Sequence, residues 1–392
     1  MGRTANQMTA LVLILLSLRL YHSAVLAGAS VFIQLVAVPV GPVAGALVDR
    51  LGSSIMIAID FLIVAVVTAC LAGLGWAHLL PVPVFLGLIL VGTVTWPFSG
   101  AGVKALLPQL VPTTLWDRAN ALDSVTSIIA TIAGPVLAGT LFGLVGPEAS
   151  LVAITCLYVA SAICVLGLRG TAPRATPAPV LAQALSGVRY FLASPQLRGL
   201  ASAMVPSNAS LGILVVAVPV LVLRTLHGGP QEVGLVWAIV GVFSLLSALV
   251  IGRLGTRGRE RWILCCSMAV PVPVLVLTAL FPSPPMTFLL AAVLGLCLGP
   301  GDVALFSLRQ RSVDPAWYGR AIAVSMTLNS SGGAIGGGLG GVLAQGSPKT
   351  AIMIAAVVSV VGAAIAWRIP RPTGLSGRPR VAEPALVGGL GR

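Results

Sequence analysis

Three carboxylic acids stand inside long apolar runs of this 392-residue sequence: Asp60, Asp123 and Asp302. Removing an ionised carboxylate from water is costly unless the group is paired, protonated or in use, so each acid is a candidate functional group. Because a carboxyl group can bind and release a proton, Asp302 and Asp60 are candidate coupling acids, with a structural ion pair or a backbone cap as the alternative. Asp123 lies one turn inside its run, where the helix dipole stabilises an anion, so we expect a structural role for it.

Isolated polar and aromatic side chains also interrupt the apolar runs and could line a pathway. The candidates are Gln34, Trp96, Ser127, Thr131, Asn208, Trp237 and Asn329. Scattered hydrogen-bonding groups in an apolar lining favour an amphiphilic or hydrophobic small molecule, and no basic cluster within a run would neutralise a phosphate. A helix-packing contact is the alternative role for each of these residues.

The sequence lacks several motifs that are typical of catalytic and metal-binding sites. It contains no P-loop, no HExxH motif and no Ser-His-acid set within the apolar runs, so we predict no catalytic residues, no cofactor and no bound metal. Six cysteines lie in apolar segments without the spacing of metal ligands, and we expect them to be small core residues. They are Cys70, Cys156, Cys164, Cys265, Cys266 and Cys297.

The elements that must position these residues are membrane-spanning helices. Hydrophobic residues make up 57% of the chain, charged residues 8%, and the mean hydropathy is +1.03. This composition excludes a soluble protein, and apolar runs of roughly 20 residues are typical of spanning helices. Runs bounded by charge, Pro or Gly predict an all-α protein with twelve spans, at 7–21, 25–48, 54–76, 82–103, 119–143, 149–168, 199–223, 230–252, 262–281, 285–308, 320–344 and 350–368.

Basic residues are distributed in a way that predicts the orientation of the chain. The formal net charge is +13, but the Lys and Arg residues sit in short clusters between apolar runs, which argues against a nucleic-acid partner. Placing both termini in the cytoplasm leaves only Arg19, Arg224 and Lys349 in the outside loops. We therefore predict a multi-pass, monomeric protein of the inner (plasma) membrane, whose partners are the lipid bilayer and a small-molecule substrate.

Four regions follow from the run pattern: a six-helix bundle (1–168), a cytoplasmic linker (169–197), a second six-helix bundle (198–368) and a disordered cytoplasmic tail (369–392). Apolar residues at helical spacing predict an amphipathic helix in the linker, at Leu181, Leu185, Val188 and Leu192.

The two predicted bundles form an internal repeat. A shift of about 200 residues superposes them, and the segment 49–52 (DRLG) then falls on 252–255 (GRLG). A repeat of this length in an all-helical membrane chain favours two similar bundles with a pathway between them.

The string GALVDRLGSS, residues 45–54, resembles the signature loop of the major facilitator superfamily. The resemblance implies that Gly45 permits close helix packing and that Gly52 makes the turn. It also implies that Asp49 and Arg50 join a cytoplasmic charge network that latches the two halves together. Two serines follow Gly52, where that family usually has basic residues.

A second segment is similar to one branch of that family. Residues 103–124, followed by GPVLAG, resemble bacterial multidrug and siderophore exporters, the branch of the enterobactin exporter. Gly134, Pro135 and Gly139 resemble the fifth-helix motif of exchangers. The resemblance implies a secondary transporter that works by alternating access, and we predict a proton-driven exporter of a small amphiphilic compound. An uptake permease and a transport-dead sensor or scaffold are the alternatives.

Glycines recur at four-residue spacing in the eleventh predicted span. Gly332, Gly336 and Gly340 form a ridge of small residues that lets a neighbouring helix backbone approach closely. Packing alone and a role in sliding or bending both remain open from the sequence.

The first predicted span is short. Apolar residues run without interruption only from Met8 to Leu18, whereas about 17 are needed to cross a bilayer. Compared with the family that it resembles, the first helix lacks its initial half. We expect either a true start upstream of Met1, which we favour, or a protein that works with a short first helix.

Overall fold

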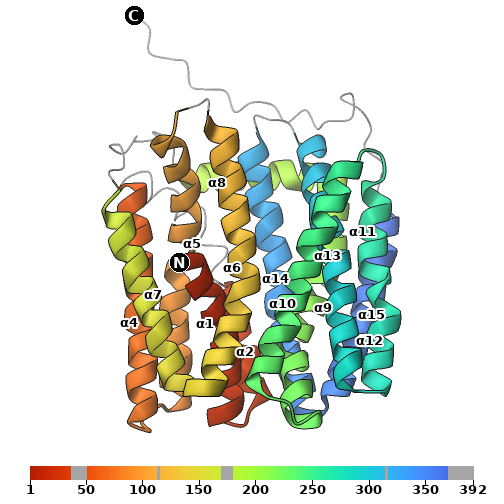
Figure 1. Ribbon diagram of the computed structural model, residues 1–392. Helices are drawn as coiled ribbons and strands as arrows, with labels where there is room; N and C mark the ends of the chain where they lie inside the picture. Colours follow the sequence, from red (N-terminus) through yellow and green to blue (C-terminus); the bar gives the residue numbers. More distant parts are fainter. Residues whose placement is uncertain (37–50, 113–114, 169–179, 314–316, 370–392) are drawn as a thin grey trace, which may run out of the picture.

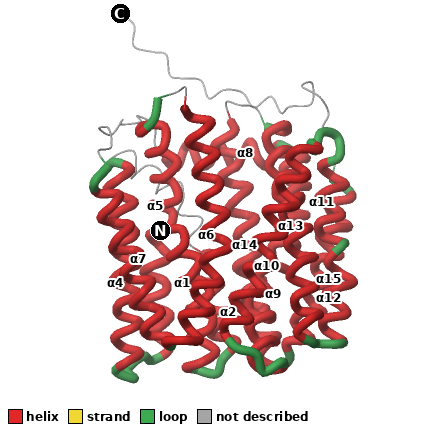
Figure 2. Tube along the Cα trace, viewed as in Figure 1, coloured by secondary structure: helices red, strands yellow, loops and turns green. Residues whose placement is uncertain are grey.

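The computed structural model describes residues 1–36, 51–112, 115–168, 180–313 and 317–369, and these residues form helices and short loops without any strand (Figure 2). The long helices run up and down along one common direction (Figure 1). The predicted linker residues 169–179 and the tail 370–392 lie outside the described residues.

Six helices make up the part that we call the N-terminal half: α1 (Gly2–Leu20), α2 (Ala24–Val36), α4 (Ser53–Trp76), α5 (Val82–Leu110), α6 (Trp116–Val145) and α7 (Pro147–Leu166). A short helix, α8 (Val180–Ala193), follows. The C-terminal half comprises α9 (Pro195–Val220, extended by a π-turn at Leu221–Thr225), α10 (Pro230–Leu254), α11 (Glu260–Ala269), α12 (Pro271–Leu280), α13 (Pro284–Ser312), α14 (Tyr318–Gly346) and α15 (Pro348–Trp367).

Every predicted span contains a helix of the structure, and nine segments of the described chain are long and apolar enough to cross a membrane. The ninth predicted span differs, because α11 ends at Ala269 and α12 begins at Pro271. Proline lacks the N–H group that would continue the helical ladder, which explains the break. Proline opens several other helices, where a missing N–H costs nothing: Pro147, Pro195, Pro230, Pro284 and Pro348.

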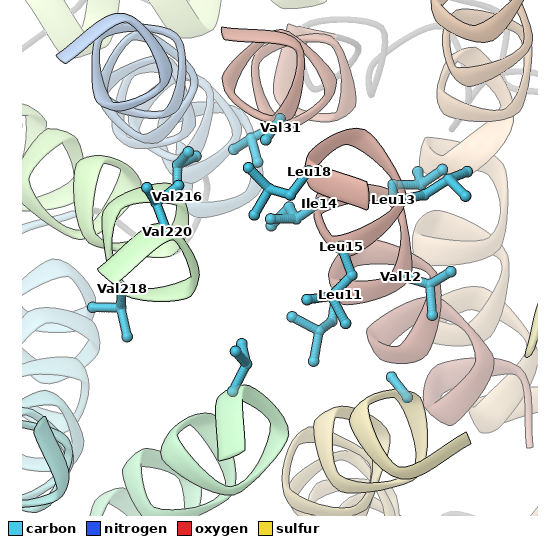
Figure 3. Packing of buried hydrophobic residues seen from close by; sticks show 14 of the residues in the cluster. Leu11, Val12, Leu13, Ile14, Leu15, Leu18, Val31, Val216, Val218 and Val220 are labelled. Carbon is cyan, nitrogen blue, oxygen red and sulfur yellow. The ribbon is translucent and has the colours of Figure 1, made fainter. Parts of the chain in front are cut away.

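Helix α1 is buried on nearly all sides. Every residue from Leu11 to Leu18 is buried, because α1 lies among α2, α6, α7 and α9. Figure 3 shows this cluster, in which side chains of α1 gather with Val31 of α2 and with valines of α9. The N-terminal end of α1 lies at about mid-height of the bundle (Figure 1). This first helix therefore lies inside the N-terminal half and also contacts α9 of the C-terminal half.

The two halves meet along two helix pairs, α2 with α14 and α6 with α10. Glycine residues let the two helix backbones approach closely at both junctions. A Cβ atom on Gly28 would lie 2.7 Å from the Cα of Gly341, and one on Gly139 would lie 3.1 Å from the Cα of Gly234. Both junctions are near the end of the bundle that lies away from α8 (Figure 1). The two halves are thus held together on the side opposite α8.

Two hydrogen bonds between the halves reinforce that side. The backbone N–H of Ala24 donates to Oε1 of Gln345 at 2.6 Å, and Nη2 of Arg224 donates to the carbonyl oxygen of His22 at 2.5 Å. Each bond joins a loop or helix end of one half to the other half.

The glycine ridge of α14 faces α9, within the C-terminal half. A Cβ atom on Gly332, Gly336 or Gly340 would contact the backbone of Val205, Ala209 or Ile213, respectively. At Gly336 it would lie 2.6 Å from the Cα of Ala209. The ridge therefore sets the distance between α14 and α9.

Replacing Gly336 with alanine is expected to lower the free energy of unfolding by about 1–3 kcal/mol, because the added methyl group meets backbone rather than a movable side chain. The measurement is thermal unfolding of the purified protein in detergent. Gly87→Ala is the matched control, since a Cβ atom there meets nothing within 4 Å and should leave the melting temperature unchanged or higher. Equal melting temperatures for the two variants would contradict this packing.

The expectation that the cysteines are core residues is wrong. Cys70, Cys156, Cys164 and Cys266 are exposed, and Cys265 and Cys297 are half-buried. An apolar sequence does not separate core from surface in this protein, because helix faces that meet lipid are also apolar.

Helix α8 packs on the C-terminal half through aromatic residues. Tyr190 and Phe191 are buried, and the ring of Tyr190 stacks on Trp317 with 5.3 Å between the ring centroids. Val188 and Leu192, two members of the predicted apolar stripe, are exposed. These two residues therefore lie on the face that turns away from the contact.

Candidate functional site

A cavity of about 450 Å³ lies in the N-terminal half, between α1, α4 and α5. Most of its wall is apolar, with residues such as Leu13, Val64 and Ile89. Its polar residues come from six helices: Arg3, Asn6, Gln7, Thr9, Gln34, Asp60, Thr68, Thr93, Ser99, Ser127 and Tyr158. This space is large enough for a small organic molecule.

Asp60 is the buried acid of this cavity. It lies about two turns inside α4, and the residue is only 2% exposed. Its Oδ1 atom accepts no hydrogen bond from any described residue, and none of the described Lys, Arg or His side chains forms an ion pair with it. The hydroxyl side chains of Ser99 and Thr95, on α5, interact with the same carboxyl group.

Asp60 combines a buried acceptor atom that has no hydrogen-bond donor among the described residues with a place in the cavity wall. A buried carboxylate without a counter-ion is strongly unfavourable, so the group must bind a proton or meet a donor or cation brought into the cavity. Asp60 is therefore the candidate group of this cavity for binding either a proton or a solute.

Tyr158 joins three helices beside this acid. Its hydroxyl oxygen lies 3.4 Å from Oγ1 of Thr9 on α1, and its ring centroid lies 5.9 Å from that of Phe61 on α4. Tyr158 itself belongs to α7 and is buried. The carboxyl region of the cavity is therefore built by α1, α4, α5 and α7 together.

The first turn of α1 is fixed to α6 by an ion pair. Nη2 of Arg3 lies 2.6 Å from Oδ1 of Asp123, and Nη1 donates to the carbonyl oxygen of Asp123 at 2.7 Å. One turn further, Nε2 of Gln7 donates to Oγ1 of Thr131 at 3.2 Å, and Gly134 makes room for the Gln7 side chain. These contacts give Asp123 a structural partner and bring Arg3 to the cavity wall.

Of the predicted pathway residues, Gln34, Trp96 and Ser127 line the cavity with Asp60. Thr131 lies next to it through its bond to Gln7, which is a lining residue. The other three, Asn208, Trp237 and Asn329, belong to the C-terminal half and are not among the lining residues.

Asp302 lies in different surroundings on α13. Its side chain is exposed, it is not among the residues that line the cavity, and Arg309 on the same helix interacts with it electrostatically. Arg309 is buried, with its guanidinium 5.7 Å from the ring centroid of Phe306. With its amide oxygen turned toward Arg309, Asn329 accepts a hydrogen bond from Nη2 at 2.5 Å. The charge of Asp302 thus has a compensating cation two turns away.

Only part of the predicted signature loop is described, since Gly45, Asp49 and Arg50 lie outside the described residues. Gly52 has φ of 94°, and Gly255, its counterpart in the repeat, has φ of 74°. Both values lie in the left-handed region that favours glycine. The two predicted repeats therefore make their turns with the same backbone conformation.

Sequence reasoning missed Tyr158, Thr9, Gln7 and Ser99. Each is a polar residue within a largely apolar segment, the same signal that selected Gln34. What selects these four is that they line one cavity with Asp60, and no local sequence pattern contains this information.

The whole chain is similar to proteins of one family. A family model described as Major Facilitator Superfamily matches residues 200–388. The MFS-type transporter y4rN of Sinorhizobium fredii is 35% identical over 381 residues, which cover 94% of this chain and 92% of that protein. The enterobactin exporter EntS of Shigella boydii is 26% identical over 284 residues, which cover 69% of this chain and 67% of that protein.

A solved structure has the same fold. A bacterial homologue of the human lysosomal transporter Spinster, in an inward-facing and occupied conformation, matches with a TM-score of 0.76 at 12% identity, over 97% of this chain and 96% of that one. On the identity with y4rN along nearly its full length, the chain belongs to the major facilitator superfamily and is a multi-pass membrane transporter.

Proposed function

We propose that the chain is a proton-coupled exporter of a small amphiphilic compound, which works by alternating access in the inner membrane. The observation that carries this proposal is the buried Asp60, whose Oδ1 has no hydrogen-bond donor among the described residues and which faces a mainly apolar cavity of about 450 Å³. Export is favoured over uptake by the likeness to an exporter, EntS.

The side from which the cavity loads follows from charge and packing. Arginines of the described chain gather on the α8 side, whereas Arg19, Arg224 and Lys349 lie on the opposite side. The positive-inside rule places the α8 side in the cytoplasm. The junctions α2–α14 and α6–α10 bring the halves together on the other side, which supports loading of solute from the cytoplasm.

Coupling in this proposal takes place at Asp60. A proton bound there makes the carboxyl group neutral, and a solute that presents a cation or donor displaces this proton. After the halves rock and open outward, a proton from outside takes the place of the solute. Asp302, on α13 of the C-terminal half and outside the cavity lining, is the second candidate for the coupling acid.

Two features remain proposals from the family resemblance. Asp49 and Arg50 would hold the cytoplasmic side closed when the chain faces outward, and Gly45 would let the helices approach there. The glycines of α6 and α14 would permit the halves to rock, since their backbones already touch neighbouring helices.

The experiment that tests this function measures the accumulation of fluorescent amphiphiles in an efflux-deficient bacterium that expresses the chain. We expect lower accumulation than in control cells, and a protonophore should abolish the difference. Asp60→Asn should abolish it as well. Glu148→Gln, at the start of α7 and outside the cavity lining, is the matched control and should behave like the wild type.

Other outcomes of this experiment favour other functions. Higher accumulation than in control cells would indicate an uptake permease. No change for any compound, with well-inserted protein, would indicate a sensor or scaffold. Loss of activity in Asp302→Asn but not in Asp60→Asn would move the coupling site to α13.

A further inference from the structure

A second hollow lies on the outer side of the C-terminal half, where a groove of about 650 Å³ runs between α10, α11 and α13. Its walls include Trp262, Cys266 and Val270 of α11 and Leu296 and Cys297 of α13. The groove shares no residue with the Asp60 cavity. It is therefore a separate site, which the proposed transport cycle does not use.

The groove opens to the surroundings of the bundle rather than to its core. Trp262 and Val270 are each 53% exposed, and Leu296 is 45% exposed. Side chains this apolar on the outer face of a spanning helix meet acyl chains of lipids. At the deep end, Pro271 interrupts one wall and Pro300 lies within the other.

The length of the groove matches one leaflet of a bilayer. Arg259 lies at its charged end, and Val270, eleven residues further, lies at its deep end. At about 1.5 Å per residue this is about 16 Å, and half of a hydrocarbon core of about 30 Å is about 15 Å. An acyl chain that enters beside Arg259 would therefore reach the end of the groove near the middle of the membrane.

The charged end carries an excess of arginine. Arg253, Arg257 and Arg259 are exposed, and none of them forms an ion pair with a described residue. The neighbouring acid, Glu260, is buried and forms its ion pair with Arg311 of α13. The positive charge at the entrance of the groove is therefore not neutralised by the described part of the protein.

Tryptophans mark this end as the level of the lipid headgroups. Trp262 and Trp367 meet edge to face with 4.5 Å between their centroids, and the guanidinium of Arg261 lies 5.2 Å from the ring centroid of Trp367. Tryptophan and arginine are enriched at the boundary between hydrocarbon and water. The charged end of the groove thus lies where a phosphate group would be.

We propose that this groove binds one acyl chain of an anionic phospholipid, with the headgroup phosphate held by Arg257 and Arg259. An apolar channel one leaflet long supplies the acyl-chain site. Unneutralised arginines at its entrance select a headgroup with net negative charge over a zwitterionic one. This lipid-binding proposal does not depend on whether the chain exports the solute proposed above.

Trp262 provides a direct test, because it lies in the groove wall. The full chain is reconstituted in phosphatidylcholine vesicles that contain increasing amounts of brominated phosphatidylglycerol or, separately, brominated phosphatidylcholine. The signal of Trp262 is the fluorescence of the wild type minus that of Trp262→Phe. We expect half-maximal quenching at a mole fraction of brominated phosphatidylglycerol about fivefold lower than that of brominated phosphatidylcholine.

Charge-matched variants distinguish lipid binding at this groove from a general attraction of anionic lipids to the positively charged side of the protein. The double variant Arg257→Gln and Arg259→Gln should bring the ratio of the two mole fractions close to one. Arg189→Gln with Arg198→Gln removes the same charge from the same side, away from the groove, and should keep the preference. Equal quenching of the wild type by both lipids would overturn the proposal, and so would an equal loss of preference in the two double variants.

A variant with a larger side chain inside the groove gives an independent test of whether lipid enters it. Cys297→Phe places a larger side chain in the channel and should weaken the quenching of Trp262 by both brominated lipids. Quenching at the wild-type level in this variant, with the protein still inserted, would show that lipid does not enter the groove.

Discussion

Replacing Asp60 with asparagine is expected to abolish solute accumulation driven by a pH gradient while leaving solute exchange intact. Asparagine keeps the size of the side chain and one acceptor oxygen, but it cannot exchange a proton. Because Asp60 is a buried acid whose Oδ1 is unpartnered among the described residues, removing its charge should not lower the free energy of unfolding by more than about 1 kcal/mol.

Proteoliposomes separate these two activities. Driven uptake is measured with an imposed pH gradient, and exchange is measured as counterflow of a labelled amphiphile without any gradient. The wild-type protein should show both, and the Asp60→Asn protein only counterflow. Driven uptake at the wild-type rate in Asp60→Asn would remove Asp60 from the coupling mechanism.

Replacing Gly139 with alanine adds one methyl group where the halves meet. We expect its effect on transport to be about as large as that of Asp60→Asn. A Cβ atom on Gly139 would lie 3.1 Å from the Cα of Gly234, and it would also press on the carbonyl oxygen of Pro230. Backbone atoms cannot move aside as a side chain can, so Gly139→Ala should destabilise the conformation that is closed opposite α8 by about 1–3 kcal/mol. That range shifts a two-state equilibrium by about 5- to 150-fold.

Accessibility of a cysteine reports this shift. Val233→Cys, a buried position beside Gly234 at this junction, is introduced into a cysteine-free background and labelled with a water-soluble thiol reagent. Gly139→Ala should increase its labelling rate about tenfold and reduce transport. Gly73→Ala, where a Cβ atom meets nothing within 4 Å, should change neither. An unchanged labelling rate in Gly139→Ala would mean that the α6–α10 contact does not hold that side closed.

Much of the fold could be predicted from the sequence because each feature is local. Hydropathy and span length place the helices, and the repeat places equivalent turns at Gly52 and Gly255, which both have positive φ. The break between α11 and α12 was equally local, at Pro271, but a prediction based on continuous apolarity treated 262–281 as one span.

The site could be predicted only in part, because its geometry depends on contacts between distant segments. Asp60 and Asp302 have the same chemistry in the sequence, yet one is buried in a cavity and the other is exposed near Arg309. Tyr158 reaches Asp60 from a helix about one hundred residues away. Apolar periodicity also could not tell core from lipid-facing residues, which is why the exposed Cys70 was expected inside.

The most direct test of the account is the movement of protons that a solute gradient causes. Proteoliposomes with a pH-sensitive dye inside are loaded with an amphiphile that the cells export and are then diluted, without any imposed pH gradient. Solute leaving through the wild-type protein should carry protons in the opposite direction and acidify the interior, whereas dilution of Asp60→Asn vesicles should cause no change in pH. Solute efflux through the wild type without acidification, or equal acidification in Asp60→Asn, would contradict the account.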